Sequence, residues 1–280
     1  NELHEAAITA NALAGLYAES VHQLLAKTEI PATAISAIGC HGQTIRHCPD
    51  LQDGLAYTSQ IGNLARLAEL TNITVVGDFR SRDIAAGGQG APLVPAFHQA
   101  VFAHATNNRA IINIGGIANI SWLPAQGTVT GFDSGPGNML LDQWVYQHTG
   151  QPYDAGGAWS ASGTVNQALL QAMLAEPYLH IAPPKSTGRD LFNQDWLAHH
   201  LQRITDAPHN IARTLLELTA LTIADAIHNH CTDVHELFAC GGGVHNGMLM
   251  SRIASAIGMP VQKTEALGIG ADWVEAVAFA

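Results

Sequence analysis

The chain has 280 residues, of which 47% are hydrophobic and 12% are charged, so it is long and apolar enough to bury a substantial core. Its 12 basic and 23 acidic residues give a net charge of −11, which argues against nucleic-acid and anionic-membrane surfaces because these need clustered Lys and Arg. A phosphorylated ligand stays compatible with this charge, since backbone amides bind phosphate without a cation.

Helical and strand patterns alternate in the first hundred residues. Residues 2–27 carry apolar side chains at a spacing near 3.6, which predicts an amphipathic helix. Residues 35–44, "ISAIGCHGQT", predict a short strand that ends in a glycine-bracketed loop. A helix is predicted over 61–71 and a strand over 72–79, followed by a loop with three glycines and a helix after Pro95. This alternation predicts α/β layers.

A change of composition after residue 105 indicates a second unit. Residues 109–138 read "RAIINIGGIANISWLPAQGTVTGFDSGPGN", which predicts strands separated by turns, with Gly115 and Gly116 at the tip of a β-hairpin. The stretch "GFDSGPGN" is predicted as a loop in which a single carboxylate, Asp133, is surrounded by very small residues. This loop is either an ordinary tight turn or a place where the backbone approaches a ligand.

Further helices and glycine turns follow. A helix is predicted over 138–150, with Gly150 as its C-cap, and a long helix over 211–230. Residues 235–258 predict strand, triple glycine and helix, and residues 268–280 predict a loop and then a helix that holds Glu275. Three glycine turns, at Gly115–Gly116, Gly135–Gly137 and Gly241–Gly243, each follow a β-like run. The chain lacks the usual single-loop nucleotide motifs, so a bound nucleotide would be held between several loops.

The four cysteines, Cys40, Cys48, Cys231 and Cys240, have neither C-x-x-C pairing nor the spacing of a zinc site. Their scatter is typical of reduced thiols in a cytoplasmic protein. The sequence contains no apolar run of membrane-spanning length and no visible signal peptide. We therefore predict a cytoplasmic protein without a metal site of its own, whose partners include neither nucleic acid nor a membrane.

Eight blocks run in order over nearly the whole chain: "HGQTIRH", "DFRSRDIAAGGQGAPLVPAFH", "NIGGIANIS", "GFDSGPGNMLLD", "GAWSASG", "KSTGRDLFN", "CGGGVHN" and "VEAVAFA". In these blocks the chain resembles the 1,6-anhydro-N-acetylmuramic acid kinase family of the sugar kinase/Hsp70/actin superfamily. The resemblance implies a two-lobed, actin-like ATPase (ribonuclease H-like) fold with the active site in the cleft between the lobes. We place the first lobe at residues 1–105 and the second at 106–280.

The family begins with a GTSxDG-type phosphate loop and continues past the last apolar helix, and neither segment is present in this sequence. We therefore expect the chain to be an internal piece of a longer protein. The resemblance implies an ATP- and Mg²⁺-dependent phosphotransferase that opens the 1,6-anhydro bridge with water and phosphorylates O6. The product, N-acetylmuramic acid 6-phosphate, belongs to the recycling of cell-wall amino sugars. A homodimer is implied by family analogy.

The resemblance also implies roles for particular residues. Asp133 would be the base that takes a proton from water, and Glu275 would assist it or orient the sugar. Nucleotide contacts are implied at Gly115, Gly116, Asn119, Gly135, Gly137, Asn138, Gly241, Gly242, Gly243 and Asn246. Sugar contacts are implied at His41, Gln43, Thr44, Arg80, Asp83, Lys185 and Arg189.

Simpler interpretations of these residues stay open. Arg80 and Asp83 could pair with each other across one turn instead of binding the lactyl carboxylate. Lys185 and Arg189 could belong to a solvated basic loop. Glu275 lies in an apolar helix, and because a buried Glu is rare unless it is paired, we expect it to face the cleft.

Three other functions also stay open. The first is an ordinary sugar-hydroxyl kinase of the same superfamily, in which Asp133 would act on the hydroxyl of the sugar itself. The second is a metal-dependent enzyme like the metallopeptidase-like members of the superfamily, although their H-x-x-x-H pair is missing from this sequence. The third is a truncated sugar-binding fragment without catalysis.

Overall fold

The structure is a computed structural model that describes residues 1–49 and 56–280 of the chain. By their internal contacts the residues form two compact units. Unit 1 is Asn1–Gly90 with Ala276–Ala280, and unit 2 is Ala91–Glu275. The mixed α/β class is confirmed. The two lobes expected at 1–105 and 106–280 stay a prediction, which differs from the two units in the assignment of residues 91–105 and 276–280.

Unit 1 contains helices and two small sheets. Its elements are α1 (Glu2–Thr28), a 3₁₀ turn η1 (Ala32–Ala34), β1 (Ile38–Cys40), β2 (Gln43–Cys48), β3 (Tyr57–Ile61), α2 (Leu64–Thr71), β4 (Val75–Gly77) and α3 (Ser81–Ala85). Strands β1 and β4 pair in parallel, and β2 and β3 pair in antiparallel fashion. A small core forms where Ala14 and Ala18 of α1 meet Leu67 of α2. Small residues at this spacing on one face of α1 allow the close approach of α2.

Two predictions for unit 1 were wrong. The part of "HGQTIRH" from Gln43 onwards belongs to strand β2 and not to a loop, because Gly42, with φ of 71°, turns the chain directly after β1 and Thr44 then pairs with Gln60 of β3. The loop predicted after residue 79 contains the short helix α3. The predicted helices α1 and α2 and the strand β4 are confirmed.

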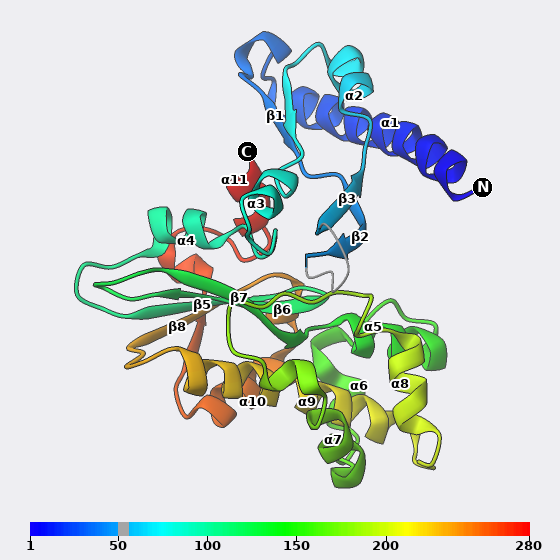
Figure 1. Cartoon of the computed structure of the whole chain (residues 1–280), viewed down its shortest axis with the longest axis vertical. Helices are drawn as coiled ribbons and strands as arrows, with labels where there is room; N and C mark the ends of the chain where they lie inside the picture. The colour runs from blue at the N-terminus through cyan, green and yellow to red at the C-terminus, as the bar shows by residue number, and fades with distance from the viewer. Residues whose placement is uncertain (50–55) are drawn as a thin grey trace. The chain divides into compact units, whose positions relative to one another are not determined.

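Unit 2 is built around one sheet with the strand order β7-β6-β5-β8-β9 (Figure 1). The strands are β5 (Arg109–Ile114), β6 (Ile117–Leu123), β7 (Thr130–Pro136), β8 (Glu236–Cys240) and β9 (Val261–Lys263). Strand β6 runs antiparallel to both β5 and β7, while β8 runs parallel to β5 and β9. Numbered along unit 2, this order is 3-2-1-4-5, as expected for a ribonuclease H-like fold.

The directions of the strands define two ends of this sheet. Because β5, β7, β8 and β9 all point the same way, Ile114, Pro136 and Cys240 lie at one end, which we call the carboxyl end. Arg109 and Glu236 lie at the opposite, amino end. In open α/β sheets, ligands bind at the carboxyl ends of strands. The topology of unit 2 therefore favours the carboxyl end as the place for a site.

Helices cover both faces of the sheet (Figure 1). They are α4 (Pro95–Phe102), α5 (Met139–Thr149), α6 (Ala158–Ala161), α7 (Gln167–Leu174), α8 (Gln194–Leu201), α9 (Pro208–His230) and α10 (Gly247–Ile257). The 3₁₀ turns are η2 (Ala155–Gly157), η3 (Pro177–His180), η4 (Gly242–His245) and η5 (Thr264–Leu267), and α11 (Val274–Phe279) crosses from unit 2 into unit 1.

The two faces of the sheet have different covers. His98 of α4 hydrogen-bonds Ser121 of β6 on one face, with 2.8 Å between Nδ1 and Oγ. On the other face, Phe132 of β7 contacts the ring of His230 of α9. Since both faces are covered, the central strand β5 is apolar without alternation, and Ile112 is fully buried. The predicted Gly115–Gly116 hairpin and helix α5 are confirmed.

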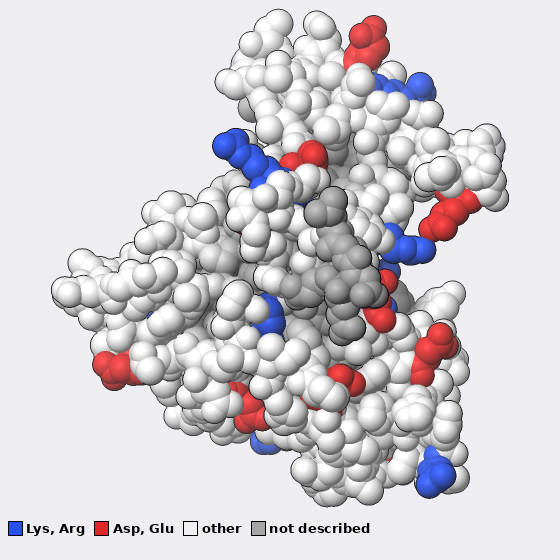
Figure 2. Space-filling view, viewed as in Figure 1, with Lys and Arg blue, Asp and Glu red and all other residues white. Residues whose placement is uncertain are grey.

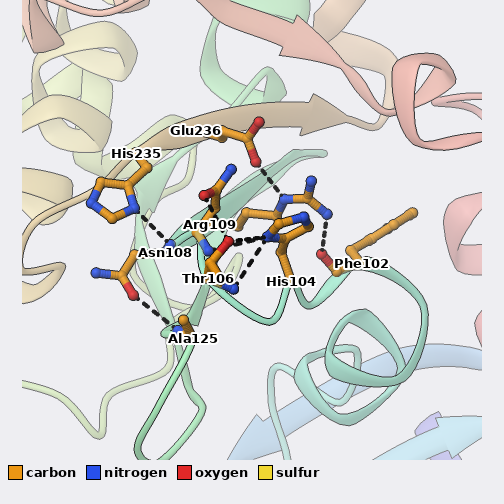
Figure 3. Close-up of polar contacts among 9 residues, drawn as sticks. Phe102, His104, Thr106, Asn108, Arg109, Ala125, His235 and Glu236 are labelled. Carbon is orange, nitrogen blue, oxygen red and sulfur yellow. Dashed lines mark hydrogen bonds and ion pairs between the residues drawn. The ribbon is translucent and has the colours of Figure 1, made fainter.

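The amino end of the sheet is closed by a polar network (Figure 3). Arg109 donates from Nε to Oε2 of Glu236 at 2.7 Å and from Nη1 to the carbonyl of Phe102 at 2.8 Å. Asn108 accepts the N–H of Ala125 at its Oδ1, and its own N–H donates to Nδ1 of His235. These bonds join α4, the start of β5, the turn after β6 and the start of β8.

Candidate active site

Three polar side chains lie in register across neighbouring strands near the carboxyl end. Asn113 of β5 pairs with Asn119 of β6, which pairs with Asp133 of β7. Directly paired residues place their side chains on the same face of a sheet, so these three form one row, which we call the polar row. Asn113 and Asp133 are buried. Within the described part of the chain, Oδ1 of Asn119 is also buried and has no hydrogen-bond partner.

A β-bulge brings Asp133 into this row. Ala118 pairs with Gly135, but the next residue, Asn119, pairs with Asp133 and skips Ser134. The sequence predicted a loop around Asp133, and this was wrong, because Thr130–Pro136 is strand β7. Bulges often aim a side chain next to an active site. Here the bulge turns Ser134 away, so that its hydroxyl bonds the carbonyl of Ala118, and sets the carboxylate beside Asn119.

The glycines after Asp133 have a structural reason. A Cβ on Gly137 would lie 2.2 Å from the carbonyl oxygen of Gly115, so only glycine lets β7 approach the hairpin tip. The N–H groups of Gly137 and Asn138 donate to the carbonyls of Gly116 and Gly115 at 2.9 and 2.8 Å. These two amides, for which nucleotide contacts were implied, are therefore used to fix the hairpin. Gly135, with φ of 154°, has Leu179 and Thr222 against its Cβ position.

A neighbouring segment holds Asp133 through three hydrogen bonds. Thr187 donates its backbone N–H to Oδ2 of Asp133 at 3.0 Å. The N–H of Asp133 donates to the carbonyl of Lys185 at 3.2 Å. The hydroxyl of Tyr178 donates to the carbonyl of Asp133 at 2.9 Å. Both the backbone and the carboxylate of Asp133 are thereby fixed.

Glu275 joins the polar row from another element. Nδ2 of Asn113 donates to Oε1 of Glu275 at 3.1 Å. The residue Glu275 is exposed, and its expected role in the cleft stays a prediction. It lies in the first turn of α11, where a negative charge is favourable. Burial, together with the negative charges of Glu275 and Glu265, raises the pKa of the Cys240 thiol to about 12, so this cysteine stays a neutral thiol.

Of the three consecutive glycines 241–243, two are needed for packing and one has open space at its Cβ position. A Cβ on Gly241 would lie 2.5 Å from Oδ1 of Asn113, and one on Gly243 would lie 2.3 Å from Cγ2 of Ile114. Both glycines are therefore needed for packing against the end of β5. Gly242 is exposed and has no atom within 4 Å of its Cβ position. Asn246, implied as a nucleotide contact, is buried and caps α10 by accepting the N–H of Leu249.

The implied sugar contacts at Lys185 and Arg189 are placed very differently. Lys185 is buried, and its Nζ donates to the carbonyls of Tyr178 and Leu179. Arg189 is exposed and lines an open pocket of about 700 Å³ beside Gly116, together with Asp142 of α5. Burial, together with repulsion from Asp154, raises the pKa of Asp142 to about 6.

A second cluster of predicted residues lies in unit 1. Arg80 donates from Nε to Nε2 of His41 at 2.8 Å and from Nη1 to the carbonyl of Gly90 at 2.6 Å. The N–H of Gly90 donates to Oδ2 of Asp83 at 2.7 Å. Arg80 and Asp83 therefore both hold the backbone of Gly90, a contact that neither sequence interpretation anticipated.

The remaining predicted sugar contacts of unit 1 lie on β2. Nε2 of Gln43 donates to the carbonyl of Thr44, and Nε2 of Gln60 donates to the hydroxyl of Thr44. The structure thus gathers the predicted residues into two sets. One surrounds the polar row of unit 2, and the other surrounds His41 and Arg80 of unit 1.

Sequence reasoning missed three residues around Asp133, namely Asn113, Tyr178 and Thr187. Asn113 had a usable signal, because an amide inside the apolar run "RAIINIGG" must find partners when it is buried. Thr187 acts through its main chain and Tyr178 lies 45 residues away in sequence from Asp133, so neither had a local signal.

Only 12% of the residues are charged. On the face drawn in Figure 2, the Lys and Arg side chains do not gather into one large patch, and some of them lie beside Asp or Glu. In the part of the chain that the structure describes, no three His, Cys, Asp or Glu side chains gather as metal ligands. None of the described helices combines the length and the hydropathy needed to cross a membrane.

Comparisons with known proteins agree on one family. The whole chain, residues 1–280, matches the family described as anhydro-N-acetylmuramic acid kinase. A protein of that name from Nitrosomonas europaea is 56% identical over 281 residues, which cover 100% of this chain and 77% of the relative. Another from Chromobacterium violaceum is 54% identical over 283 residues, covering 100% of this chain and 76% of the relative.

Proposed function

The chain belongs to the anhydro-N-acetylmuramic acid kinase family, and on that premise we propose that it phosphorylates 1,6-anhydro-N-acetylmuramic acid with ATP while water opens the anhydro bridge. The oxygen of water bonds C1 and the bond between C1 and O6 breaks. O6 bonds the γ-phosphorus, and the bond from that phosphorus to ADP breaks. The products are ADP and N-acetylmuramic acid 6-phosphate. Because the reaction consumes ATP, we place the protein in the cytoplasm, and the homodimer stays a prediction.

We assign the proton of the attacking water to Asp133. Water is a poor nucleophile at neutral pH, so a carboxylate within hydrogen-bond reach must take its proton, which contributes about 10²–10⁴-fold to the rate. The observation that carries this assignment is the polar row. Asp133 is buried there, with Oδ2 held by Thr187, beside the buried Oδ1 of Asn119. That amide oxygen can accept a hydrogen bond from the attacking water or from a sugar hydroxyl.

The glycine turns fit the ATP substrate. Gly116 is exposed at the hairpin tip, where backbone N–H groups can surround a phosphate. Gly242 of η4, Gly156 of η2 and Gly247 of α10 are all exposed, and Gly247 lies near the carbonyl of Gly156. A surface without Cβ atoms suits the flat rings of adenosine. Mg²⁺ would be held mainly by the nucleotide phosphates and water, since it rarely uses an all-protein cage.

We propose that Glu275, Arg189 and His41 contact the sugar. Glu275, hydrogen-bonded to Asn113, would orient the sugar next to Asp133. Arg189 is exposed beside Gly116 and carries the fork that suits the lactyl carboxylate. In unit 1, Arg80 and Asp83 are fixed on Gly90, which gives His41 a defined orientation for contact with the sugar.

A coupled assay of ADP release tests this proposal. Wild type is expected to release ADP only when 1,6-anhydro-N-acetylmuramic acid is present. Asp133→Asn is expected to lose about 10²–10⁴-fold in kcat with little change in KM, because the amide keeps the shape but cannot take a proton. ADP release that does not depend on the sugar would overturn the function, and equal turnover by the two proteins would overturn the role of Asp133.

A further inference from the structure

Lys185 is buried in a way that its predicted role as a sugar contact does not explain. Only 5% of its surface is exposed. Its Nζ donates to the carbonyls of Tyr178 and Leu179, both at 3.3 Å, and lies 4.8 Å from the centre of the Tyr178 ring. A lysine is almost never buried to this degree unless it is paired. Two long bonds to neutral carbonyls are weak compensation for an ammonium group taken out of water.

The negative charge that acts on this ammonium is Asp133. Burial lowers the pKa of Lys185, while the carboxylate of Asp133 acts in the opposite direction and favours the charged form. The two residues are also joined through their backbones, since the N–H of Asp133 donates to the carbonyl of Lys185. This bond fixes the spacing of the two backbones from which the ammonium and the carboxylate extend.

Tyr178 connects the two residues a second time. Its hydroxyl donates to the carbonyl of Asp133, while its ring and its own carbonyl contact the ammonium of Lys185. Burial raises the pKa of Tyr178, and the charge of Asp133 raises it further, so the hydroxyl stays a donor. With the N–H of Thr187 on Oδ2, the segment from Tyr178 to Thr187 contacts the backbone N–H, the carbonyl and the carboxylate of Asp133.

Other titratable groups also face Lys185. A pocket of about 270 Å³ is lined by Lys185, His180 and, from α9, Asp225 and His230. Burial lowers the pKa of His230, and the positive charge of Lys185 lowers it further. His230 is therefore expected to be neutral at the pH at which a kinase works. Asp225 is exposed to water, which screens its charge.

We propose that Lys185 is a positioning residue for the catalytic base, and that its buried ammonium keeps Asp133 ionised so that the carboxylate can accept the proton of water. The inference rests on the proposed function, because it concerns the same base. It replaces the sugar contact implied for Lys185, since a side chain that is 5% exposed and bonded to two carbonyls presents little to a ligand. Tyr178 and Thr187 act with it by fixing the orientation of the carboxylate.

The pH dependence of kcat in Lys185→Met tests the proposal. Methionine keeps much of the stem and removes the charge, which makes a nearby carboxylate easier to protonate. The acid limb of the profile is expected to move up by about one pH unit, so that kcat is about ten-fold lower at pH values below the wild-type limb, while KM for the sugar changes less than about two-fold. An acid limb at the wild-type position would overturn the proposal.

Two control variants separate charge from structure. Tyr178→Phe keeps the ring under the ammonium but loses the hydrogen bond to Asp133, so kcat is expected to fall while the acid limb stays in place. Lys263→Met removes an exposed lysine of β9 and is expected to leave the profile unchanged. If Lys185→Met does not fold, Lys185→Gln is the second neutral variant, because its amide can still donate to a carbonyl.

A titration that needs no turnover separates this inference from the proposed function. The ¹³C resonance of the Asp133 carboxyl, assigned by its loss in Asp133→Asn, is followed with pH in wild type and in the neutral variant. Its midpoint is expected to be higher in the variant. In wild type alone, the ¹⁵Nζ resonance of Lys185 is expected to shift at the same pH as that carboxyl. Independent midpoints would overturn the inference, whereas a wild type without sugar-dependent ADP release overturns only the function.

Discussion

Both ends of the unit 2 sheet carry polar side chains, but they differ in how completely the described residues supply hydrogen-bond partners. At the amino end, Arg109 bonds Glu236 and the carbonyl of Phe102, so the guanidinium is matched by acceptors. At the carboxyl end, the polar row leaves the buried Oδ1 of Asn119 without a partner among the described residues and sets a buried carboxylate beside it. One end is a closed structural network, and the other has bonding capacity left for a ligand.

This difference separates polar residues that stabilise from those that act. Strand sequence alone does not distinguish them, because Arg109 and Asn113 lie on the same face of the same apolar strand. What differs is the number of partners that the fold supplies. Substitutions at the amino end should therefore lower the free energy of unfolding. Substitutions at the carboxyl end should lower activity, either directly or by disturbing the packing around the polar row.

The largest effect on folding is expected from Gly137→Ala. The new Cβ would lie 2.2 Å from the carbonyl oxygen of Gly115 and 3.1 Å from the N of Ala118, and backbone atoms cannot move aside easily. We expect a loss of about 2–4 kcal/mol in the free energy of unfolding, together with loss of turnover. Gly242→Ala is the matched control, since it has open space around its Cβ position. Its stability should change by less than about 0.5 kcal/mol while ATP affinity falls. Urea unfolding measures the stability of the two variants.

His98 of α4, which packs against β6, should make stability depend on pH. Burial lowers its pKa from the usual value of 6.5 to about 4. The neutral form is favoured in the fold, so its stabilising contribution is present above pH 6.5 and is lost as the pH falls towards 4. The fall is expected to reach up to about 3 kcal/mol. His98→Asn keeps a polar group for Ser121 but cannot titrate, so unfolding curves at several pH values should lack this component. Parallel curves for both proteins would contradict the assignment.

At the amino end, Arg109→Met should lower the free energy of unfolding and leave kcat nearly unchanged. The side chain of Glu236 is 29% exposed and can be rehydrated, so we expect a loss of about 1–2 kcal/mol and a kcat within about two-fold of wild type. The hydrogen bond from Arg109 lowers the pKa of Glu236 from the usual 4.5. The difference between the proteins should be complete above pH 4.5 and shrink as the pH falls below it. A large loss of kcat would contradict the purely structural role given to the amino end.

The smallest effect is expected beside the carboxyl end, at Asp142. Its pKa is raised to about 6, so the fold favours the protonated carboxyl, and the stability this gives is present below the usual value of 3.8 and is lost as the pH rises through 6. Asp142→Asn stays neutral at every pH. We expect it to be more stable than wild type above pH 6 by less than about 1 kcal/mol, since water screens the partly exposed group. Thermal unfolding at pH 4 and pH 8 measures this, and an equal difference at both would contradict it.

The alternation of elements in this chain could be predicted from local pattern. The 3.6-residue spacing marked α1, α2 and α9, and the Gly115–Gly116 pair marked the hairpin between two isoleucine-rich strands. The short strand β2 was missed because "HGQTIRH" has few β-branched residues and its pairing with β3 depends on residues farther along the chain.

The site was predictable only in part. Asp133 stood out because a lone acid among glycines is unusual, but the packing of Gly137 against the hairpin could not be predicted from the sequence. The bulge that aims Asp133 is a register shift between two strands, and a single sequence does not show register. Tyr178 and Thr187, which hold Asp133, come from a distant segment of the chain. Each of their hydrogen bonds to Asp133 has a main-chain atom as donor or acceptor, so side-chain types alone do not predict it.

The central claim is that Asp133 delivers water to C1 from the polar row. The most direct measurement is mass spectrometry of the product formed in ¹⁸O-labelled water, quenched early, with unlabelled product incubated alongside to correct for exchange at C1. The account predicts one solvent oxygen at C1 in wild type, formed together with ADP, and formation slower by about 10²–10⁴-fold in Asp133→Asn. A phosphorylated sugar without solvent oxygen at C1, or labelling at the same rate in both proteins, would contradict it.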